Sequence, residues 1–251
     1  MPPPSSSSLE PRASCLPSIV LLTGAGISAE SGLRTFRGSD GLWEDHRVED
    51  VATPEAFRRD PALVQRFYNE RRRTLRTVQP NAAHAALARL DAAWPGELLL
   101  VTQNVDDLHD RAGSRRLLHM HGELRRARCL ACAAVHPWDH DLEPTSRCPG
   151  CAESGKLRPH IVWFGEVPLG LDRIFAALAD CSIFISIGTS GNVYPAAGFV
   201  QAVPPPARTV EINLEPGMLS RAFMEHRLGP ATVKVPELVE DLLQGLPGVK
   251  E

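Results

Sequence analysis

Several features that would place a protein in a particular class are missing from this sequence of 251 residues. No apolar run approaches the roughly 18–20 residues that a helix needs to cross a bilayer. The net charge is −3 and no basic stripe dominates, whereas nucleic-acid-binding proteins concentrate positive charge on one face. Residues 1–17 are rich in Pro and Ser but lack the charged and apolar regions of a secretory signal. We therefore expect a flexible tail over residues 1–17, a cytoplasmic location, and no nucleic-acid or membrane partner.

Cysteine is also scarce, with six residues in the chain. A chain of this length with 43% apolar residues can bury a core without disulfide bonds. Four of the six cysteines form two C-x-x-C pairs, Cys129 with Cys132 and Cys148 with Cys151. Two such pairs can deliver four thiolates to one tetrahedral zinc ion. Four sulfur ligands leave no open position for water, so we predict a structural zinc and expect the chemistry elsewhere.

Short apolar runs alternate with helical patterns along most of the chain, which is typical of a parallel α/β sheet. The expected strands are 18–23, 98–102, 116–120, 161–164, 182–188, 209–213 and 231–235. Apolar positions three or four residues apart predict helices at 62–77, 81–93, 171–179 and 236–246. The predicted fold class is therefore α/β, with a Rossmann-like, doubly wound parallel sheet.

Two stretches lack this alternation of strand and helix patterns. Residues 38–77 show no strand pattern, and residues 125–157 are rich in Cys, Pro and charge with little periodicity. We expect them to be a helical insertion and a zinc-binding insertion that together form a small second domain. The Rossmann-like domain would then comprise residues 18–37, 78–124 and 158–251.

The first expected strand runs into the sequence GAGISA at residues 24–29, a G-x-G-x-x-A pattern. Glycines at such a junction let the backbone approach a pyrophosphate, and the helix N-terminus supplies free N–H groups. By itself the pattern is compatible with dinucleotide binding or with a glycine turn that holds no ligand. A dehydrogenase would place an acidic residue after a second strand about 20 residues later. That distance falls at residues 43–45, which show no strand pattern, whereas Asn213-Leu214-Glu215 follows a late strand and is another candidate for the ribose.

His121 is the most informative of the nine histidines. It follows the expected strand 116–120 and precedes Gly122, and α/β enzymes keep their sites at strand ends near a crevice. Residues 103–106 (Gln-Asn-Val-Asp) leave another strand with three polar side chains. Position alone leaves open whether these side chains form a site, cap a helix or pack in the core.

Taken together, these segments resemble the sirtuins, the NAD-dependent protein deacylases. The matching stretches occur in the family's order and extend from about Ile19 to the C-terminus. They are GAGISAESGLRTFRG (24–38), TQNVDDLHDRAG (102–113), HG (121–122), the four cysteines, RPHIVWFGE (158–166), GTS (188–190) and NLE (213–215).

The resemblance implies that NAD is a co-substrate and that His121 is the catalytic base. Arg34 and Phe36 would lie on a mobile flap over the nicotinamide pocket. The acyl oxygen would attack C1′ of the nicotinamide ribose, and nicotinamide would leave. His121 would then accept a proton relayed through the ribose hydroxyls, so that the 2′-oxygen attacks the imidate carbon, and water would resolve the intermediate. The residues that the resemblance assigns to NAD are Gly24, Ala25, Gly26, Ile27, Ser28, Ala29, Glu30, Ser31, Gly32, Leu33, Arg34, Thr35, Phe36, Arg37, Trp43, Gln103, Asn104, Val105, Asp106, Gly188, Thr189, Ser190, Asn213, Leu214, Glu215 and Ala231.

The resemblance also indicates which acyl groups are removed. Sirtuins that remove succinyl, malonyl or glutaryl groups carry Tyr-x-x-Arg where this chain has Tyr68-Asn69-Glu70-Arg71. The two side chains lie on one helix face, where the guanidinium can hold a carboxylate and the phenol can add a hydrogen bond. Ala52 matches the small residue that widens the acyl channel in this branch. We predict removal of succinyl and malonyl groups, alongside acetyl groups, from protein lysines.

Three other functions remain as alternatives. A sirtuin-like mono-ADP-ribosyltransferase would move ADP-ribose onto a protein. A zinc-ribbon interaction or DNA-binding module is disfavoured by the lack of a basic face. A dehydrogenase is disfavoured because its acidic ribose-binding residue is not where it should be. We expect the protein to act as a monomer.

Overall fold

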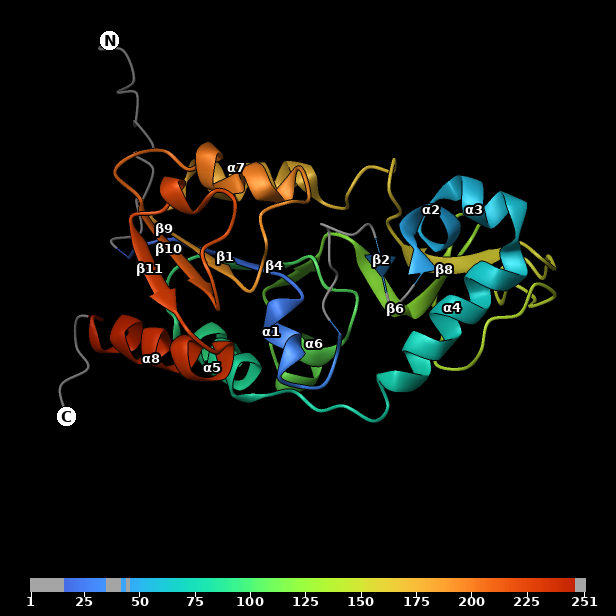
Figure 1. Ribbon diagram of the computed structural model, residues 1–251, viewed down its shortest axis with the longest axis horizontal. Coiled ribbons are helices and arrows are strands. Elements are labelled where there is room, and N and C mark those ends of the chain that lie inside the picture. The colour runs from blue at the N-terminus through green and yellow to red at the C-terminus, as the bar shows by residue number, and fades with distance from the viewer. Residues whose placement is uncertain (1–15, 35–41, 44–45, 247–251) are drawn as a thin grey trace, which may run out of the picture.

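A six-stranded parallel sheet forms the larger part of the molecule in the computed structural model, which describes residues 16–34, 42–43 and 46–246 (Figure 1). The strand order is β11-β10-β9-β1-β4-β5. Because β1 lies between β4 and β9, the chain winds outward from it in both directions, and a crevice opens at the carboxyl ends of these strands. The strands are β1 (Ile19–Thr23), β4 (Leu98–Thr102), β5 (Leu117–His119), β9 (Ile183–Ile187), β10 (Arg208–Asn213) and β11 (Glu225–Leu228).

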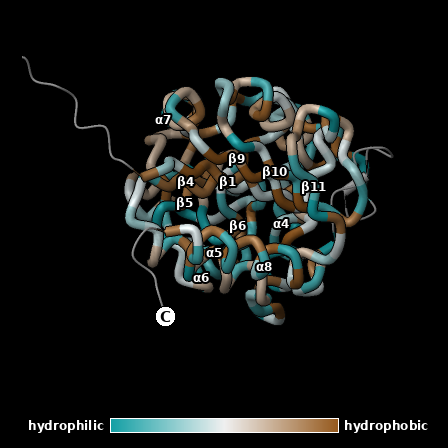
Figure 2. Tube along the Cα trace, turned by 90° about the vertical axis from the view of Figure 1, so that its left-hand side faces the viewer, coloured by the Kyte–Doolittle hydropathy of each residue, from teal (hydrophilic) through white to brown (hydrophobic). Residues whose placement is uncertain are grey.

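Helices cover both faces of this sheet, so every residue of its central strands β1, β4 and β9 is buried, and four of the five residues in each are apolar (Figure 2). Alternate residues of β1 point to opposite faces: Ile19 packs towards one layer and Val20 towards the other. The first layer contains α5 (Ala82–Ala93) and α8 (Ala231–Gln244). The second contains α7 (Leu171–Ala179) and the 3-10 helix η1 (Ala196–Ala202). The result is the doubly wound α/β fold expected from the sequence.

A smaller part of the molecule lies beyond the carboxyl ends of the sheet (Figure 1). It contains a three-stranded antiparallel sheet in the order β7-β6-β8. Its other described elements are three helices and an antiparallel pair of strands that are two residues long each. Its elements are β2 (Leu42–Trp43), β3 (His46–Arg47), α2 (Val48–Val51), α3 (Pro54–Arg59), α4 (Pro61–Thr74), β6 (Gly122–Cys129), β7 (Val135–Pro137) and β8 (Leu157–Ile161). Two short helices of the larger part, α1 (Gly26–Ala29) and α6 (Leu108–Ala112), lie near the junction.

Helix α4 is tied to the antiparallel sheet by two buried polar side chains. The Arg72 guanidinium donates to the carbonyl oxygen of Leu124 on β6 (2.8 Å) and to Oδ1 of Asn69 (2.7 Å). Asn69 in turn donates to the carbonyl oxygen of Leu142 (3.0 Å) and accepts from its N–H (2.8 Å). These bonds pair Nε and Nη1 of Arg72 and both polar atoms of the Asn69 side chain, which would otherwise be costly to bury, and they fix the helix against the cysteine-bearing segment.

The strand expected at residues 231–235 is wrong. Residues 231–235 begin helix α8, because Ala231, Val235, Leu238 and Leu242 form one buried helical face. The true edge strand is β11, whose sequence EHRL carries three polar residues and gives no apolar run.

The strand expected at 161–164 lies earlier in the chain, because β8 ends at Ile161. The N–H of Val162 donates to the carbonyl oxygen of His121 (2.8 Å), and that of Phe164 donates to Ala52 (3.0 Å). These residues therefore connect the two parts of the molecule instead of extending a strand. The segment 38–77, expected to have no strand, contains the short β2–β3 pair.

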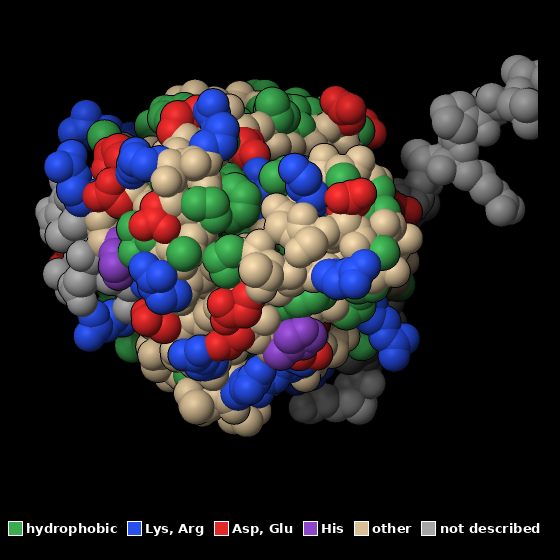
Figure 3. Space-filling view, turned by 90° about the vertical axis from the view of Figure 1, so that its right-hand side faces the viewer, with side chains coloured by type: hydrophobic (Ala, Val, Ile, Leu, Met, Phe, Trp, Pro, Cys, Tyr) green, Lys and Arg blue, Asp and Glu red, His purple; other side chains and the backbone are tan. Residues whose placement is uncertain are grey.

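The described surface agrees with the charge balance of the sequence. Positive and negative side chains are interspersed over the end of the molecule opposite the parallel sheet (Figure 3). Among the described residues no helix is long and apolar enough to cross a bilayer.

Candidate active site

A cavity of about 1160 Å³ lies where the carboxyl ends of β1, β4 and β9 face the smaller part of the molecule. Residues from both parts line it, as is common for ligand sites between domains. The predicted site residues in its wall are Gly24, Ala25, Gly26, Ser28, Ala29, Glu30, Gly32, Leu33, Arg34, Tyr68, Arg71, Gln103, Asn104, Val105, Asp106, His121, Gly188, Thr189, Ser190, Asn213, Leu214, Glu215 and Ala231.

Two described residues of the predicted set are not part of the cavity wall. The Ile27 side chain is fully buried and packs in the core beneath the sheet. The Ser31 hydroxyl accepts a hydrogen bond from Nδ2 of Asn81 (3.0 Å). Thr35, Phe36 and Arg37 lie outside the described residues, and only the backbone of Trp43 is described.

The glycines of the first turn pack against a second glycine turn after β9. The N–H of Gly26 donates to the carbonyl oxygen of Gly188 (2.8 Å). A Cβ on Gly26 would lie 2.7 Å from Gly188 Cα, and a Cβ on Gly188 would lie 2.5 Å from the backbone nitrogen of Ile27. Gly188 also has φ +61°, which disfavours any side chain. The sequence pattern left open a ligand-binding turn or a plain glycine turn at residues 24–29, and the structure shows that Gly26 and Gly188 are also needed for close contact between the two loops.

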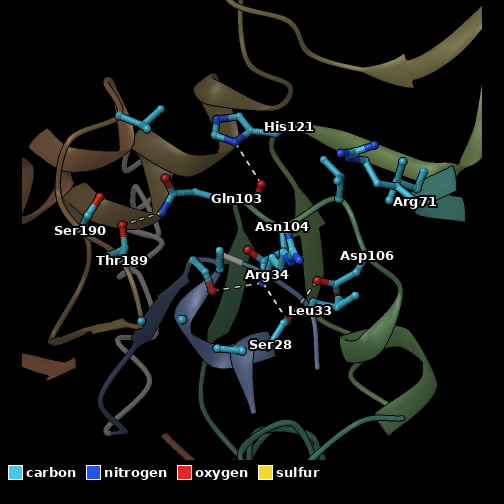
Figure 4. Close-up of a pocket in the computed structure, with 18 of the residues that line it drawn as sticks. Ser28, Leu33, Arg34, Arg71, Gln103, Asn104, Asp106, His121, Thr189 and Ser190 are labelled. Carbon is cyan, nitrogen blue, oxygen red and sulfur yellow. Dashed lines mark hydrogen bonds between the residues drawn. The ribbon is translucent and has the colours of Figure 1, made fainter. Parts of the chain in front are cut away.

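Three polar side chains join the turn after β1 to the turn after β4 (Figure 4). Nδ2 of Asn104 donates to the carbonyl oxygen of Gly24 and to Oγ of Ser28, both at 3.1 Å. Oγ of Ser28 donates to Oδ2 of Asp106 (3.0 Å). Burial raises the pKa of Asp106, and the hydrogen bonds from Leu108 and Ser28 oppose that shift. The resemblance assigned each of these residues to NAD, and the structure brings them into hydrogen-bond contact with one another.

Asn81 and His84 contact the segment that carries Ser28, and neither of them was assigned to the site from the sequence. Asn81 caps α5, and its Nδ2 donates to the carbonyl oxygen of Ile27 (2.8 Å). His84 Nε2 lies 3.4 Å from Oγ of Ser28, and burial lowers the pKa of His84 to about 4. The apolar spacing predicted a helix over 81–93, but no local signal predicted contacts 50 or more residues away.

His121 lies after β5, with its ring in the cavity (Figure 4). Its Nδ1 is 3.0 Å from the carbonyl oxygen of Gln103. A carbonyl can only accept, so Nδ1 carries the hydrogen and Nε2 of the neutral ring carries a lone pair. Burial lowers the pKa of His121, and the bond to Gln103 opposes this in part. The imidazole is therefore held in the neutral form and tautomer of a base.

The cavity has two ends on either side of His121 (Figure 4). Thr189 and Ser190 lie at one end, where the Thr189 hydroxyl accepts from Nε2 of Gln103 (3.1 Å). Arg71 lies at the other end, with its guanidinium carbon 3.2 Å from the centroid of the Phe67 ring. Tyr68 is fully buried beside it. A nucleotide at one end and a carboxylate at the other would thus both lie near the imidazole.

The four paired cysteines form a cluster in the antiparallel sheet segment. Their sulfur atoms all lie within 4.8 Å of one another, with Cys129 to Cys151 at 3.7 Å and Cys132 to Cys148 at 3.8 Å. Zn–S bonds of about 2.3 Å in a tetrahedron place sulfurs about 3.8 Å apart. The N–H groups of Ala131 and Gly150 point at two of the sulfurs, both at 3.4 Å. The cluster fits one structural zinc ion and contributes no residue to the cavity.

The residues of this site match a known protein family. The model of the Sir2 family matches residues 24–195, which include the glycine turns, His121 and the four cysteines. The chain belongs to the Sir2 family. Among curated Sir2 relatives, a protein of Escherichia coli strain K12 named NAD-dependent protein deacylase is 58% identical over 239 residues, covering 94% of this chain and 86% of that protein. A protein of the same name from Yersinia pseudotuberculosis is 59% identical over 230 residues, covering 90% of this chain and 83% of that protein.

Solved Sir2 structures share the fold. A Sir2 homologue mutant in complex with ADP-ribose superposes with a TM-score of 0.84 at 39% identity, covering 93% of this chain and 95% of that one. A Sir2 homologue in complex with NAD superposes with a TM-score of 0.82 at 40% identity, covering 90% of each chain. The Rossmann-like sheet with its smaller cysteine-bearing part is thus confirmed as the Sir2 architecture.

Proposed function

We propose that this Sir2 protein is an NAD-dependent protein-lysine deacylase. The main support is the neutral His121, held by Gln103 in a cavity with room for a nucleotide on one side and an acyl-lysine on the other. The name of the curated relatives agrees with this activity. The reaction would place the enzyme among transferases, because ADP-ribose moves from nicotinamide to the acyl oxygen. One water would resolve the intermediate, and the products would be nicotinamide, O-acyl-ADP-ribose and free lysine.

NAD would bind along the crevice between the two glycine turns. Backbone N–H groups around Gly24–Gly26 and Gly188 would face the pyrophosphate, and Asn213 with Glu215 would face the adenosine. Gln103, Asn104 and Asp106 would contact the nicotinamide and its ribose. The other residues of the predicted NAD set, including those outside the described part of the chain, keep this role as a proposal.

His121 would act as the general base. Bound NAD supplies an electrophilic ribose carbon, and the residues around it orient the acyl oxygen towards that carbon. Nε2 of His121 carries the lone pair and faces the cavity, so it would accept the proton that leaves the ribose hydroxyls. The bond from Nδ1 to Gln103 would hold the ring in place as the proton arrives.

Arg71 and Tyr68 would select acyl groups that end in a carboxylate. The guanidinium is stacked on Phe67 and half-buried, so a carboxylate can meet it in a partly dry site. The small Ala52 in the cavity wall leaves space for the longer chain. Succinyl and malonyl groups are the proposed substrates, with acetyl as a further one.

The acylated peptide would bind between the two parts of the molecule as an added strand. Gly165 and Val193 both line the cavity, and residues 165–167 and 192–193 would pair with the peptide backbone. The domain boundaries, the cytoplasmic location and the monomeric state expected from the sequence remain part of this proposal.

Matched succinyl-lysine and acetyl-lysine peptides test the proposal with NAD. We expect Arg71→Met to lower kcat/KM for succinyl-lysine by about a hundredfold while some acetyl turnover remains. Arg73→Met is the matched control, since Arg73 lies on the same helix but is exposed and pairs with Asp141. Equal loss of both activities in Arg71→Met would make the acyl preference wrong. Mass spectra that show ADP-ribosylated protein instead of O-acyl-ADP-ribose would favour a mono-ADP-ribosyltransferase.

A further inference from the structure

A hydrogen bond between two buried aromatic side chains lies beneath the acyl end of the cavity. Nε1 of Trp163 donates to Oη of Tyr68 at 2.9 Å, and the two side chains are 2% and 0% exposed. They are 95 residues apart in the sequence, on the loop after β8 and on α4. Both also line the cavity. The bond therefore joins the two walls that would enclose the acyl chain.

The direction of this bond is fixed by chemistry. An indole N–H can only donate, so the Tyr68 oxygen is the acceptor. The phenol has one hydrogen of its own, and that hydrogen must point away from Trp163. Burial raises the pKa of Tyr68, so the hydroxyl keeps this hydrogen at physiological pH.

Trp163 is itself held firmly. The guanidinium carbon of Arg158 lies 3.4 Å from the centroid of the indole, and Arg158 pairs with Glu166 through two contacts of 2.6 and 2.9 Å. Glu166 also accepts from the backbone N–H of Trp163 (2.9 Å). The ring of Phe57 packs on the indole, with centroids 5.3 Å apart. An indole fixed in this way can fix the orientation of its acceptor.

We propose that Trp163 is a positioning residue for acyl-group recognition. Its N–H holds the Tyr68 oxygen as an acceptor, so that the phenol donates its own hydrogen to the carboxylate of a succinyl or malonyl group. Arg71, one helical turn after Tyr68, receives the same carboxylate as a cation. This inference rests on the acyl preference proposed above and adds a residue outside the Tyr-x-x-Arg pattern.

The simpler role for Trp163 is apolar packing along the acyl-lysine channel. Packing would serve every acyl group equally, because the hydrocarbon part of the chain is common to all of them. Positioning of a hydroxyl donor serves only acyl groups with a terminal carboxylate. The ratio of succinyl to acetyl turnover therefore distinguishes the two roles.

Trp163→Phe in the full-length, zinc-loaded enzyme tests the proposal, since it keeps an aromatic ring and removes the N–H. We expect the succinyl-to-acetyl ratio of kcat/KM to fall about tenfold. In a Tyr68→Phe background, the same substitution should cause no further fall, because the acceptor is already absent. Trp138→Phe is the matched control: Trp138 is also buried and donates Nε1 to the Asp141 carbonyl oxygen (3.3 Å), so the acyl ratio should not change.

If Trp163→Phe fails to fold, NMR spectra of the tryptophan indole N–H groups in the protein with Trp163 intact test the same hydrogen bond. The chain has four tryptophans, so ¹⁵N-indole spectra are simple to assign. The Trp163 signal should shift in Tyr68→Phe and on addition of a succinyl-lysine peptide, and it should shift less with the acetyl peptide. No shift in Tyr68→Phe would overturn the hydrogen bond.

Two further outcomes separate this inference from the proposed function. If the unmodified enzyme removes succinyl groups but Trp163→Phe lowers both activities equally, the role of Trp163 is wrong and the acyl preference stands. If the unmodified enzyme removes acetyl groups and no succinyl groups, the acyl preference is wrong and the role of Trp163 is overturned with it. Effects of Trp163→Phe and Tyr68→Phe that multiply would also overturn the role.

Discussion

The imidazole of His121 donates from Nδ1 to the carbonyl oxygen of Gln103, a residue of the loop that follows the neighbouring strand β4. The base and the turn that would hold the nicotinamide ribose are thus joined by one hydrogen bond of 3.0 Å. The ring cannot rotate without breaking it. The hydrogen bond therefore fixes both the tautomer of His121 and the position of its ring relative to the turn after β4.

Replacement of His121 with Ala should lower deacylation by about a hundredfold or more, because general-base catalysis contributes on that scale. Product formation from acyl-lysine peptide and NAD measures the effect. Zinc content and the melting temperature should stay close to those of the unmodified protein, since the side chain lies in a cavity. Retained deacylation in a folded His121→Ala protein would rule out this base.

The pH dependence of kcat/KM should reflect the lowered pKa of His121. A base acts when it is deprotonated, so activity falls as the pH drops through its pKa. Burial places that pKa below the ordinary value of 6.5, so the acid limb should lie below pH 6.5. An acid limb above pH 6.5 that does not depend on His121 would assign the titration to another group.

Gly188→Ala should destabilise the fold more than Gly113→Ala. Both positions have positive φ, +61° and +101°, so both substitutions cost about 1–2 kcal/mol of backbone strain. A Cβ at Gly113 meets no atom within 4 Å, whereas one at Gly188 would lie 2.5 Å from Ile27 N. The overlap should add about 1–3 kcal/mol. Urea unfolding of the two variants measures the difference, and equal midpoints would contradict the proposed loop packing.

Cys148→Ser should reduce the bound zinc and lower the melting temperature. Cys148 is buried, and its thiolate would be one of four ligands, so its loss opens the tetrahedral site. Metal analysis of the purified protein gives the zinc content. Cys181→Ser is the matched control, because Cys181 is buried in the core of the parallel sheet and outside the cluster. Full zinc occupancy in Cys148→Ser would contradict the four-sulfur site.

The central sheet could be predicted because its strands are buried on both faces. Residues 19–23, 98–102 and 183–187 each contain four apolar residues and one Thr or Ser, and each forms a strand at or within one residue of the expected bounds. The edge strand β11 is only half-buried, and its polar residues gave no such pattern. The strand expected at 231–235 is wrong because the spacing of buried residues in α8 is helical.

The site could be predicted only where a motif carries its chemistry locally. The glycine turn, His121 and the four cysteines each stand in a recognisable stretch of sequence. The bonds that hold these residues join distant segments: Ser28 to Asp106, Asn81 to Ile27, and Trp163 to Tyr68. Spacing along a chain does not specify which side chains approach across a fold, so these contacts required the structure.

Helix α4 carries Tyr68 and Arg71 towards the acyl end of the cavity, while the alternating residues Asn69 and Arg72 bind the segment that holds the cysteines. A small displacement of the metal-bearing sheet would therefore move the Arg71 guanidinium, which we propose binds the terminal carboxylate of the acyl group. If Arg71 selects the acyl group as proposed, mutations far from any substrate atom would change which acyl groups are removed. Partial loss of the metal would then weaken that selection before it unfolds the parallel sheet.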